Sequence, residues 1–358
     1  MKRIIIAVLL AGSMLPGYSQ TLSAYTDYRE YFYVFDDGVS QMLEYFPVQS
    51  YRVGGACLAY IDNKGVFKIF FKNNKITLEK YKVTHYFSTN NLLVYTLENQ
   101  LIIFDRGKRL TLVYHPNIYA FGDSIVAFYD ETSSYLKAYY DGEIREVEAG
   151  LSGRPMKSML VGDNLFAYVD QADYFKIFYR GELIEESYRP YNYKVGGNTV
   201  AYVTEAELEF KIFYRGTTHT VESFEPQSYK AGEDMVAYVD ETGSFKVFYQ
   251  GKVIEVSSFE PEFYRITANM LIYSEGDFLK VFADGESHTL ANYIPEKYYV
   301  HRNVVAFIDE QDQLQGFYKG QLETISYEKL NNIEIFGNAV SFEIGIHTNK
   351  TYYKGTVY

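Results

Sequence analysis

The chain has 358 residues, of which 47% are hydrophobic and 22% charged, a composition that excludes a disordered protein. Its formal net charge of −12 argues against a nucleic-acid partner, because phosphates would be repelled. Tyr (38 residues) and Phe (26) are abundant while Trp is absent, and such aromatic richness favours β-strands.

The N-terminal segment has the three regions of a secretory signal. Lys2 and Arg3 precede an apolar run over residues 4–10, and small and turn-forming residues follow up to Ser19. We expect a signal peptide over residues 1–19, cleaved near Ser19, and a repeat domain over residues 20–358. Cleavage removes Lys2 and Arg3 and so moves the formal charge from −12 to −14. The predicted location is periplasmic or secreted.

The alternative for this segment is a membrane anchor. Its apolar run is shorter than the ~20 residues that span a bilayer, and no other segment qualifies, so we predict no transmembrane segment after cleavage. The mature chain holds one cysteine, Cys57. It therefore forms no internal disulfide, and we expect it to pack as a small apolar residue.

The rest of the chain is built from ten copies of a unit of about 35 residues. The copies share an aromatic column in a small-apolar context: Tyr25, Tyr60, Tyr95, Phe128, Tyr168, Tyr202, Tyr238, Tyr273, Phe307 and Phe342. A second column contains only glycine and one asparagine: Gly38, Asn73, Gly107, Gly142, Gly181, Gly216, Gly251, Gly285, Gly320 and Gly355. Both residue types adopt a positive φ at low cost, so this column predicts a tight turn between two strands.

Each unit is predicted to form four short strands. In the copy around Tyr238 these are residues 227–231, 235–240, 245–250 and 252–257, separated by Gly232-Glu233-Asp234, by residues 241–244 and by Gly251. Four such strands cannot bury both faces alone and must stack on their neighbours. The predicted fold class is all-β, a β-propeller of about ten four-stranded repeats.

The segment from Gly196 to Val203, followed by Phe210-Lys211-Ile212-Phe213-Tyr214-Arg215-Gly216, resembles the TolB-like β-propeller repeats. That resemblance covers nearly the whole mature chain and implies a turn, a strand ending in an apolar-aromatic pair and a second aromatic strand. The units lack the family's Ser-Pro-Asp-Gly turn and its Trp, so it implies neither blade number nor function.

Ring closure is left open by the sequence. The first copy begins at its second strand, and the last ends about two residues into its fourth. A single ten-bladed ring, two smaller rings and an open array all fit, with the best internal break at residues 148–157, where Gly150, Gly153 and Pro155 lie in a longer interval. We favour the single ring.

The sequence offers no catalytic, cofactor-binding or metal-binding residues, and leaves any ligand-binding residues unknown. The six histidines fall at no common repeat position: His85, His115, His219, His288, His301 and His347. The nucleophile, zinc and phosphate motifs are missing. We therefore expect scattered surface histidines and no cofactor.

Three polar columns each allow a site or a structural role. An acidic column follows the second strand: Asp27, Asp62, Asp130, Asp170, Asp240, Glu275 and Asp309. A basic column lies in the third strand: Lys68, Lys137, Lys176, Lys211, Lys246, Lys280 and Lys350. A tyrosine column lies in the first strand: Tyr51, Tyr86, Tyr119, Tyr193, Tyr229, Tyr264 and Tyr298. We expect the acidic column to start turns rather than to form a Ca²⁺ ring. We expect the basic column to form salt-bridged strand edges rather than an anionic groove. We expect the tyrosine column to pack between blades rather than to stack on sugars.

These observations favour an exported, non-catalytic binding or scaffold protein that presents a rigid surface to a protein or glycan partner in the envelope or outside the cell. The alternative is an exported hydrolase or lyase acting on polysaccharide or peptide, with its site on propeller loops. An enzyme should interrupt the repeat locally, and only residues 148–157 deviate in length. They offer Arg154 and Lys157 but no acid-base pair.

Overall fold

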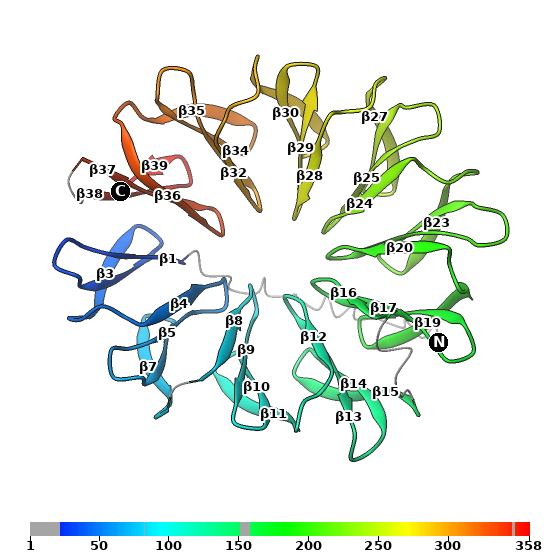
Figure 1. The fold of residues 1–358 in the computed structure, drawn as a ribbon, viewed down its shortest axis with the longest axis horizontal. Helices are drawn as coiled ribbons and strands as arrows, with labels where there is room; N and C mark the ends of the chain where they lie inside the picture. The colour runs from blue at the N-terminus through cyan, green and yellow to red at the C-terminus, as the bar shows by residue number, and fades with distance from the viewer. Residues whose placement is uncertain (1–21, 82, 151–157, 346–347) are drawn as a thin grey trace, which may run out of the picture.

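The computed structural model describes residues 22–81, 83–150, 158–345 and 348–358. They form ten antiparallel sheets arranged as the blades of one ring around a central axis, as Figure 1 shows. In each four-stranded blade the strands pair in chain order, with the first nearest the axis and the fourth at the rim. The predicted all-β propeller is confirmed, and the single ring holds against two smaller rings or an open array.

The first five blades run from residue 22 to residue 188. Their strands are β1 (Leu22–Thr26), β2 (Phe32–Asp36) and β3 (Val39–Glu44); β4 (Ser50–Val53), β5 (Leu58–Ile61), β6 (Phe67–Phe71) and β7 (Asn74–Glu79); β8 (His85–Ser88), β9 (Leu92–Leu97), β10 (Gln100–Asp105) and β11 (Lys108–Tyr114); β12 (Tyr119–Phe121), β13 (Ile125–Asp130), β14 (Tyr135–Tyr140) and β15 (Glu143–Ala149); and β16 (Leu160–Val161), β17 (Leu165–Val169), β18 (Tyr174–Tyr179) and β19 (Glu182–Tyr188).

The other five blades run from residue 192 to residue 357. Their strands are β20 (Asn192–Val195), β21 (Thr199–Val203), β22 (Phe210–Tyr214) and β23 (Thr217–Glu222); β24 (Ser228–Ala231), β25 (Met235–Val239), β26 (Phe245–Tyr249) and β27 (Lys252–Ser257); β28 (Tyr264–Thr267), β29 (Met270–Glu275), β30 (Phe278–Ala283) and β31 (Glu286–Ala291); β32 (Tyr298–His301), β33 (Val304–Ile308), β34 (Leu314–Tyr318) and β35 (Gln321–Ser326); and β36 (Leu330–Phe336), β37 (Ala339–Ile344), β38 (Thr348–Tyr353) and β39 (Thr356–Val357).

The glycine and asparagine column occupies the turn between the third and fourth strands. Every residue of the column has a positive φ, from 62° at Asn73 to 94° at Gly38, and the residue before it is also left-handed, as at Asp37 (φ 43°). Two consecutive positive φ values define the hairpin turn whose twist matches that of the flanking strands. This local requirement explains why the column tolerates only glycine and asparagine.

The core lies between blades and repeats with them. Phe210 of β22 packs against two tyrosines of the next blade, Tyr229 and Tyr238, with ring centroids 5.0 and 5.2 Å apart. The same triad recurs around Phe32, Phe67, Phe175 and Phe245. Such aromatic contacts bury large apolar areas, so each blade is stabilised chiefly by its neighbours. Cys57 is fully buried, as predicted.

The ring closes where the first and last blades meet. The first blade has three strands among the described residues, beginning at β1, and the last ends in the two-residue β39, as the sequence indicated. Phe35 contacts the rings of Tyr353 and Tyr358, and Lys354 Nζ lies 3.2 Å from Asp37 Oδ1. Side chains therefore hold this junction between two separate sheets. Residues 151–157 of the predicted internal break lie outside the described residues.

Candidate functional site

The acidic and basic columns form ion pairs within their blades. Lys68 Nζ lies 2.7 Å from Asp62 Oδ2, and the column pairs recur as Lys137–Asp130, Lys176–Asp170, Lys246–Asp240 and Lys280–Glu275. Lys68 also contacts Glu44 of the preceding blade, whose carboxylate accepts the hydroxyl hydrogen of Tyr60 at 2.9 Å. The two columns thus join neighbouring blades, so neither forms an open ring of free charges.

The acidic column also begins turns. Asp240 Oδ1 accepts the backbone N–H groups of Thr242 and Ser244, each at 2.9 Å. Burial disfavours its charged form, but the Lys246 ammonium, the Thr242 hydroxyl and the two amides outweigh burial and lower the pKa of Asp240 to about 2. The prediction of turn-starting carboxylates is confirmed at this and equivalent positions.

The tyrosine column packs between blades rather than facing a ligand. Tyr86, Tyr229 and Tyr264 are each less than one-tenth exposed, and each lies against the phenylalanine of the preceding blade. The hydroxyl groups of Tyr86 and Tyr264 bond to serines of the preceding blade's first strand, at 2.8 and 2.9 Å. This column is therefore unavailable as a stacking platform.

The prediction that no histidines share a repeat position was wrong for two of them. His219 and His288 occupy equivalent places in β23 and β31, and each ring contacts a phenylalanine of the next blade, Phe248 or Phe317. Pairing register reveals this equivalence, which simple counting along the chain obscured. Within the described residues, no group of three or more His, Cys, Asp or Glu side chains is arranged to hold a metal ion.

The antiparallel order gives the ring two distinct faces. The turn face carries the turns between first and second strands and between third and fourth strands. The connection face carries the turns between second and third strands and the segments that link one blade to the next, such as residues 223–227 and 258–263.

On the turn face, the turns after the first strands bond to each other around the axis. Asn164 N–H donates to Gly197 O at 3.0 Å, Asn198 N–H to Glu233 O at 2.7 Å, and Glu233 N–H to Ala268 O at 2.9 Å. The turns approach so closely that a Cβ on Gly162 would lie 1.7 Å from Gly196 O. This glycine column went unrecognised in the sequence, although Gly54, Gly122, Gly162, Gly196 and Gly232 recur at one repeat position.

Charged side chains converge where these turns meet. Arg302 Nη2 lies 2.7 Å from Asp123 Oδ2, although their blades stand on opposite sides of the ring in Figure 1. Burial and the neighbouring charges of Asp123 and Glu233 raise the pKa of Asp163 to about 7, while Arg302 opposes that rise. Burial likewise raises the pKa of Glu233. The turn face thus holds a half-buried carboxylate cluster clamped by one arginine.

The connection face exposes large aromatic and apolar side chains at repeated positions. Phe224 is 58% exposed and Phe259 77%, and both precede a glutamate and a buried proline, in Phe224-Glu225-Pro226 and Phe259-Glu260-Pro261. The wider set of exposed large side chains in the connections, or at the strand ends that lead into them, is Tyr45, Phe46, Tyr81, Tyr114, Tyr188, Tyr191, Phe224, Phe259, Ile294 and Tyr327. Single exposed apolar residues are normal on protein surfaces, and their repetition from blade to blade makes this face the candidate interaction surface.

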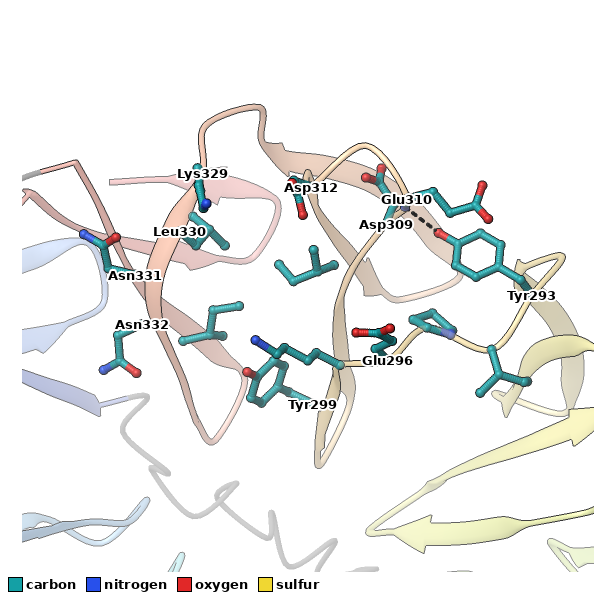
Figure 2. Close-up of a pocket in the computed structure, with 15 residues that line it drawn as sticks. Tyr293, Glu296, Tyr299, Asp309, Glu310, Asp312, Lys329, Leu330, Asn331 and Asn332 are labelled. Atoms are coloured by element: carbon teal, nitrogen blue, oxygen red, sulfur yellow. Dashed lines mark hydrogen bonds between the residues drawn. The ribbon is translucent and has the colours of Figure 1, made fainter.

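A cleft of about 530 Å³ opens on this face between the last two blades. Figure 2 shows Tyr293 and Glu310 at one end and Lys329, Asn331 and Asn332 along the opposite wall. The hydroxyl oxygen of Tyr293 accepts the backbone N–H of Glu310 at 3.0 Å, which fixes that end. Glu296, Asp309 and Asp312 also line the cleft and make it mainly acidic.

Charge divides the connection face into two halves. The blades from β20 to β35 present exposed carboxylates there: Glu205, Glu207, Glu241, Glu260, Glu262, Asp277, Glu296, Glu310, Asp312 and Glu328. In the connections and second-to-third turns of the same half, the exposed lysines are Lys297 and Lys329, and Lys194 and Lys230 are exposed in the first strands. The blades from β1 to β19 carry both signs of charge on this face or at its edge. Their exposed cations are Arg29, Lys64, Lys80 and Arg189, and their exposed carboxylates include Glu30, Glu98 and Glu131. Sequence reasoning missed the division because it followed the buried columns.

The ten-bladed ring agrees with the result of sequence comparison. Residues 17–358 match the family described as the 10-bladed beta propeller domain. The chain belongs to this family. The match spans nearly the whole chain and includes every blade of the ring. No curated protein matches the chain, and its TolB-like resemblance stays a prediction.

Several solved structures are similar to this family member. The CRINKLY WD40 ectodomain of the Arabidopsis thaliana receptor kinase ACR4 is 10% identical, with a TM-score of 0.37, and the match covers 68% of this chain and 97% of that one. The computationally designed Ika8 protein is 14% identical (TM-score 0.30; 86% and 96% covered). The ectodomain of the Physcomitrella patens receptor kinase CR4 is 6% identical (TM-score 0.34; 66% and 72% covered).

Proposed function

We propose that this ten-bladed propeller is an exported, non-catalytic binding or scaffold protein that uses its connection face to hold a protein partner. The repeated exposure of aromatic residues on that face carries the proposal. Phe224, Phe259 and Tyr327 are each more than half exposed. Buried aromatic side chains supply the packing between blades. The exposed aromatic side chains gain no such hydrophobic stabilisation in the free protein, and burial against a bound partner would provide it.

Rigid support strengthens this interpretation. Pro226 and Pro261 are buried and anchor two connections, so the preceding aromatic side chains project from a fixed backbone. A pre-organised aromatic surface loses little conformational entropy on binding, which is why such residues dominate the energy of protein interfaces. Protein is favoured over glycan because aromatic and acidic residues alternate over an extended arc.

Binding of the full-length mature chain to a displayed peptide library and a glycan array tests the function. Phe224→Ser, Phe259→Ser and Tyr327→Ser, combined, should weaken any captured peptide more than about tenfold, as loss of interface aromatics does. The matched control is Leu183→Ser, Val253→Ser and Leu322→Ser, which changes exposed apolar residues of the rim strands. Ligands that bind both triple variants and the wild type equally would contradict the proposal.

Export has its own test. Residues 1–19 carry the pattern of a cleaved signal, so expression in a bacterial host should place the protein outside the cytoplasm, with an N-terminus at or near Gln20. Replacing residues 4–10 by serine and glycine should retain it in the cytoplasm. An uncleaved N-terminus on exported protein would favour the membrane anchor instead. Nowhere in the described part of the chain is there a helix of the length and apolarity that crossing a membrane requires.

A further inference from the structure

The aromatic residues of the connection face lie beside carboxylates on one half of the ring. Glu260 and Glu262 flank the buried Pro261 next to Phe259, and Glu296 follows Ile294 in the next connection. All three glutamates are exposed. Within the described residues they form no ion pair, in contrast to the acidic column, where Asp62 and Asp240 are held by lysines.

The arc ends in the cleft between the last two blades, where Figure 2 places the acidic side chains Glu310 and Asp312 near its upper rim. Exposed apolar side chains, Phe224, Phe259 and Ile294, therefore lie near exposed carboxylates along the arc to this cleft. Lysine and arginine meet both kinds of group, because their ammonium or guanidinium groups pair with carboxylates while their stems and cations lie on aromatic faces.

We propose that the arc from Phe224 to the acidic cleft binds a lysine- or arginine-rich protein segment that also carries apolar side chains. This inference rests on the proposed function. Charge complementarity selects this occupant. The other half of the same face also exposes aromatics, Phe46 and Tyr81, but its exposed charges are mixed. The cations Arg29, Lys64 and Lys80 offset the carboxylates there, so a cationic segment is attracted less strongly than to the acidic half. Shape alone would not distinguish the halves, since the blades repeat.

The probe is a short fluorescent peptide in which lysine alternates with phenylalanine, separated by glycine and serine. Matched peptides exchange lysine for glutamate or phenylalanine for serine. Fluorescence anisotropy with the full-length mature chain should show binding of the first peptide and weaker binding of both others. Added salt should weaken the first complex, because exposed charges are screened.

The decisive variant is Glu260→Gln, Glu262→Gln and Glu296→Gln. Its control, Glu182→Gln, Asp284→Asn and Glu286→Gln, removes the same charge from exposed positions of the turn face. The arc variant should bind the lysine peptide roughly tenfold more weakly, as the loss of three surface ion pairs predicts, and the control should bind it about as well as wild type. All substituted positions are exposed, so folding is expected to persist and circular dichroism checks it.

Equal loss in both variants, no loss in the arc variant, or equal binding of the glutamate peptide would overturn the inference. So would a neutral glycan that the arc variant still binds, or self-association of the wild type that the arc variant abolishes, which would make a second copy the occupant. If the aromatic triple variant loses its ligands while the arc variant keeps them, the inference fails and the proposed function stands. If neither variant affects any ligand, both fail.

Discussion

Arg302 and Asp123 join opposite sides of the ring at the turn face, with Nη2 and Oδ2 2.7 Å apart although the two residues are 179 positions apart in sequence. Both side chains are largely shielded from solvent, at 28% and 19% exposure. Besides Asp123, Arg302 acts on two further carboxylates near the axis, Asp163 and Glu233. It opposes the raised pKa values of both groups.

Replacing Arg302 by methionine should destabilise the ring by about 1–2 kcal/mol near pH 8, because three half-buried carboxylates lose their common cation. This loss of stability should be smaller near pH 5, where Asp163, with a pKa of about 7, has taken up a proton. Urea denaturation at both pH values measures it. Glu143→Gln, which breaks the exposed pair with Arg145, should cost less than about 0.5 kcal/mol at either pH. A pH-independent effect of Arg302→Met would contradict this account.

Asp163 should make the wild type less stable as pH rises. Its pKa of about 7 in the folded protein exceeds the ordinary aspartate value of 3.8, so the folded state binds more protons than the unfolded state between these limits. Stability from this group is therefore present at low pH and falls as pH rises through about 7. Asp163→Asn removes the charge, so the stability of the variant relative to wild type should increase from pH 5 to pH 8. A constant difference between them would refute the raised pKa.

Asp240 should show the opposite dependence. Its folded pKa of about 2 lies below the unfolded value of 3.8, so it stabilises the fold above the unfolded pKa and loses that effect as pH falls through about 2. Asp240→Asn should cost about 2 kcal/mol at neutral pH and much less near pH 2, by linkage. Glu241→Gln, the neighbouring exposed carboxylate, is the control and should change little. Denaturation curves across this pH range decide it.

Gly162→Ala should destabilise the ring by about 3 kcal/mol or more, because the new Cβ would meet a backbone carbonyl that cannot move without breaking contacts between turns. Gly243→Ala is the matched control. Gly243 has a φ of 89° and nothing within 4 Å of an added Cβ, so only backbone strain of about 1–2 kcal/mol is expected there. Similar losses at the two sites would show that the turns around the axis are not tightly packed.

The blade itself could be read from the sequence because its causes are local. The turn at Gly251 demands a positive φ, the run from Phe245 to Tyr249 demands a strand, and both requirements recur in every copy. The predicted strands around Tyr238 match β24 to β27 within one residue at each end. The roles of Asp240 and Lys246 were likewise predictable, since an aspartate that starts a turn faces the lysine of the strand pairing with its own.

The candidate site was not predictable in the same way. Phe245 and Phe259 are equally apolar in sequence, yet the first is fully buried between blades and the second is 77% exposed. The motif Phe-Glu-Pro at residues 224–226 and 259–261 was a visible signal, but its exposure depends on where the connection runs over the ring. The pair Arg302–Asp123 had no local signal, because it joins blades that are far apart in the chain.

By itself, the sequence determined the unit: four strands, their turns and the aromatic columns that pack between copies, all set by backbone preference and pairing within about 35 residues. Tertiary structure decided the number of blades in one ring, the two faces, the convergence of Asp123, Asp163, Glu233 and Arg302 at the axis, and the exposure of the aromatic arc. These features depend on the angle at which each blade stacks on the next, and that angle is set by packing summed over the whole ring.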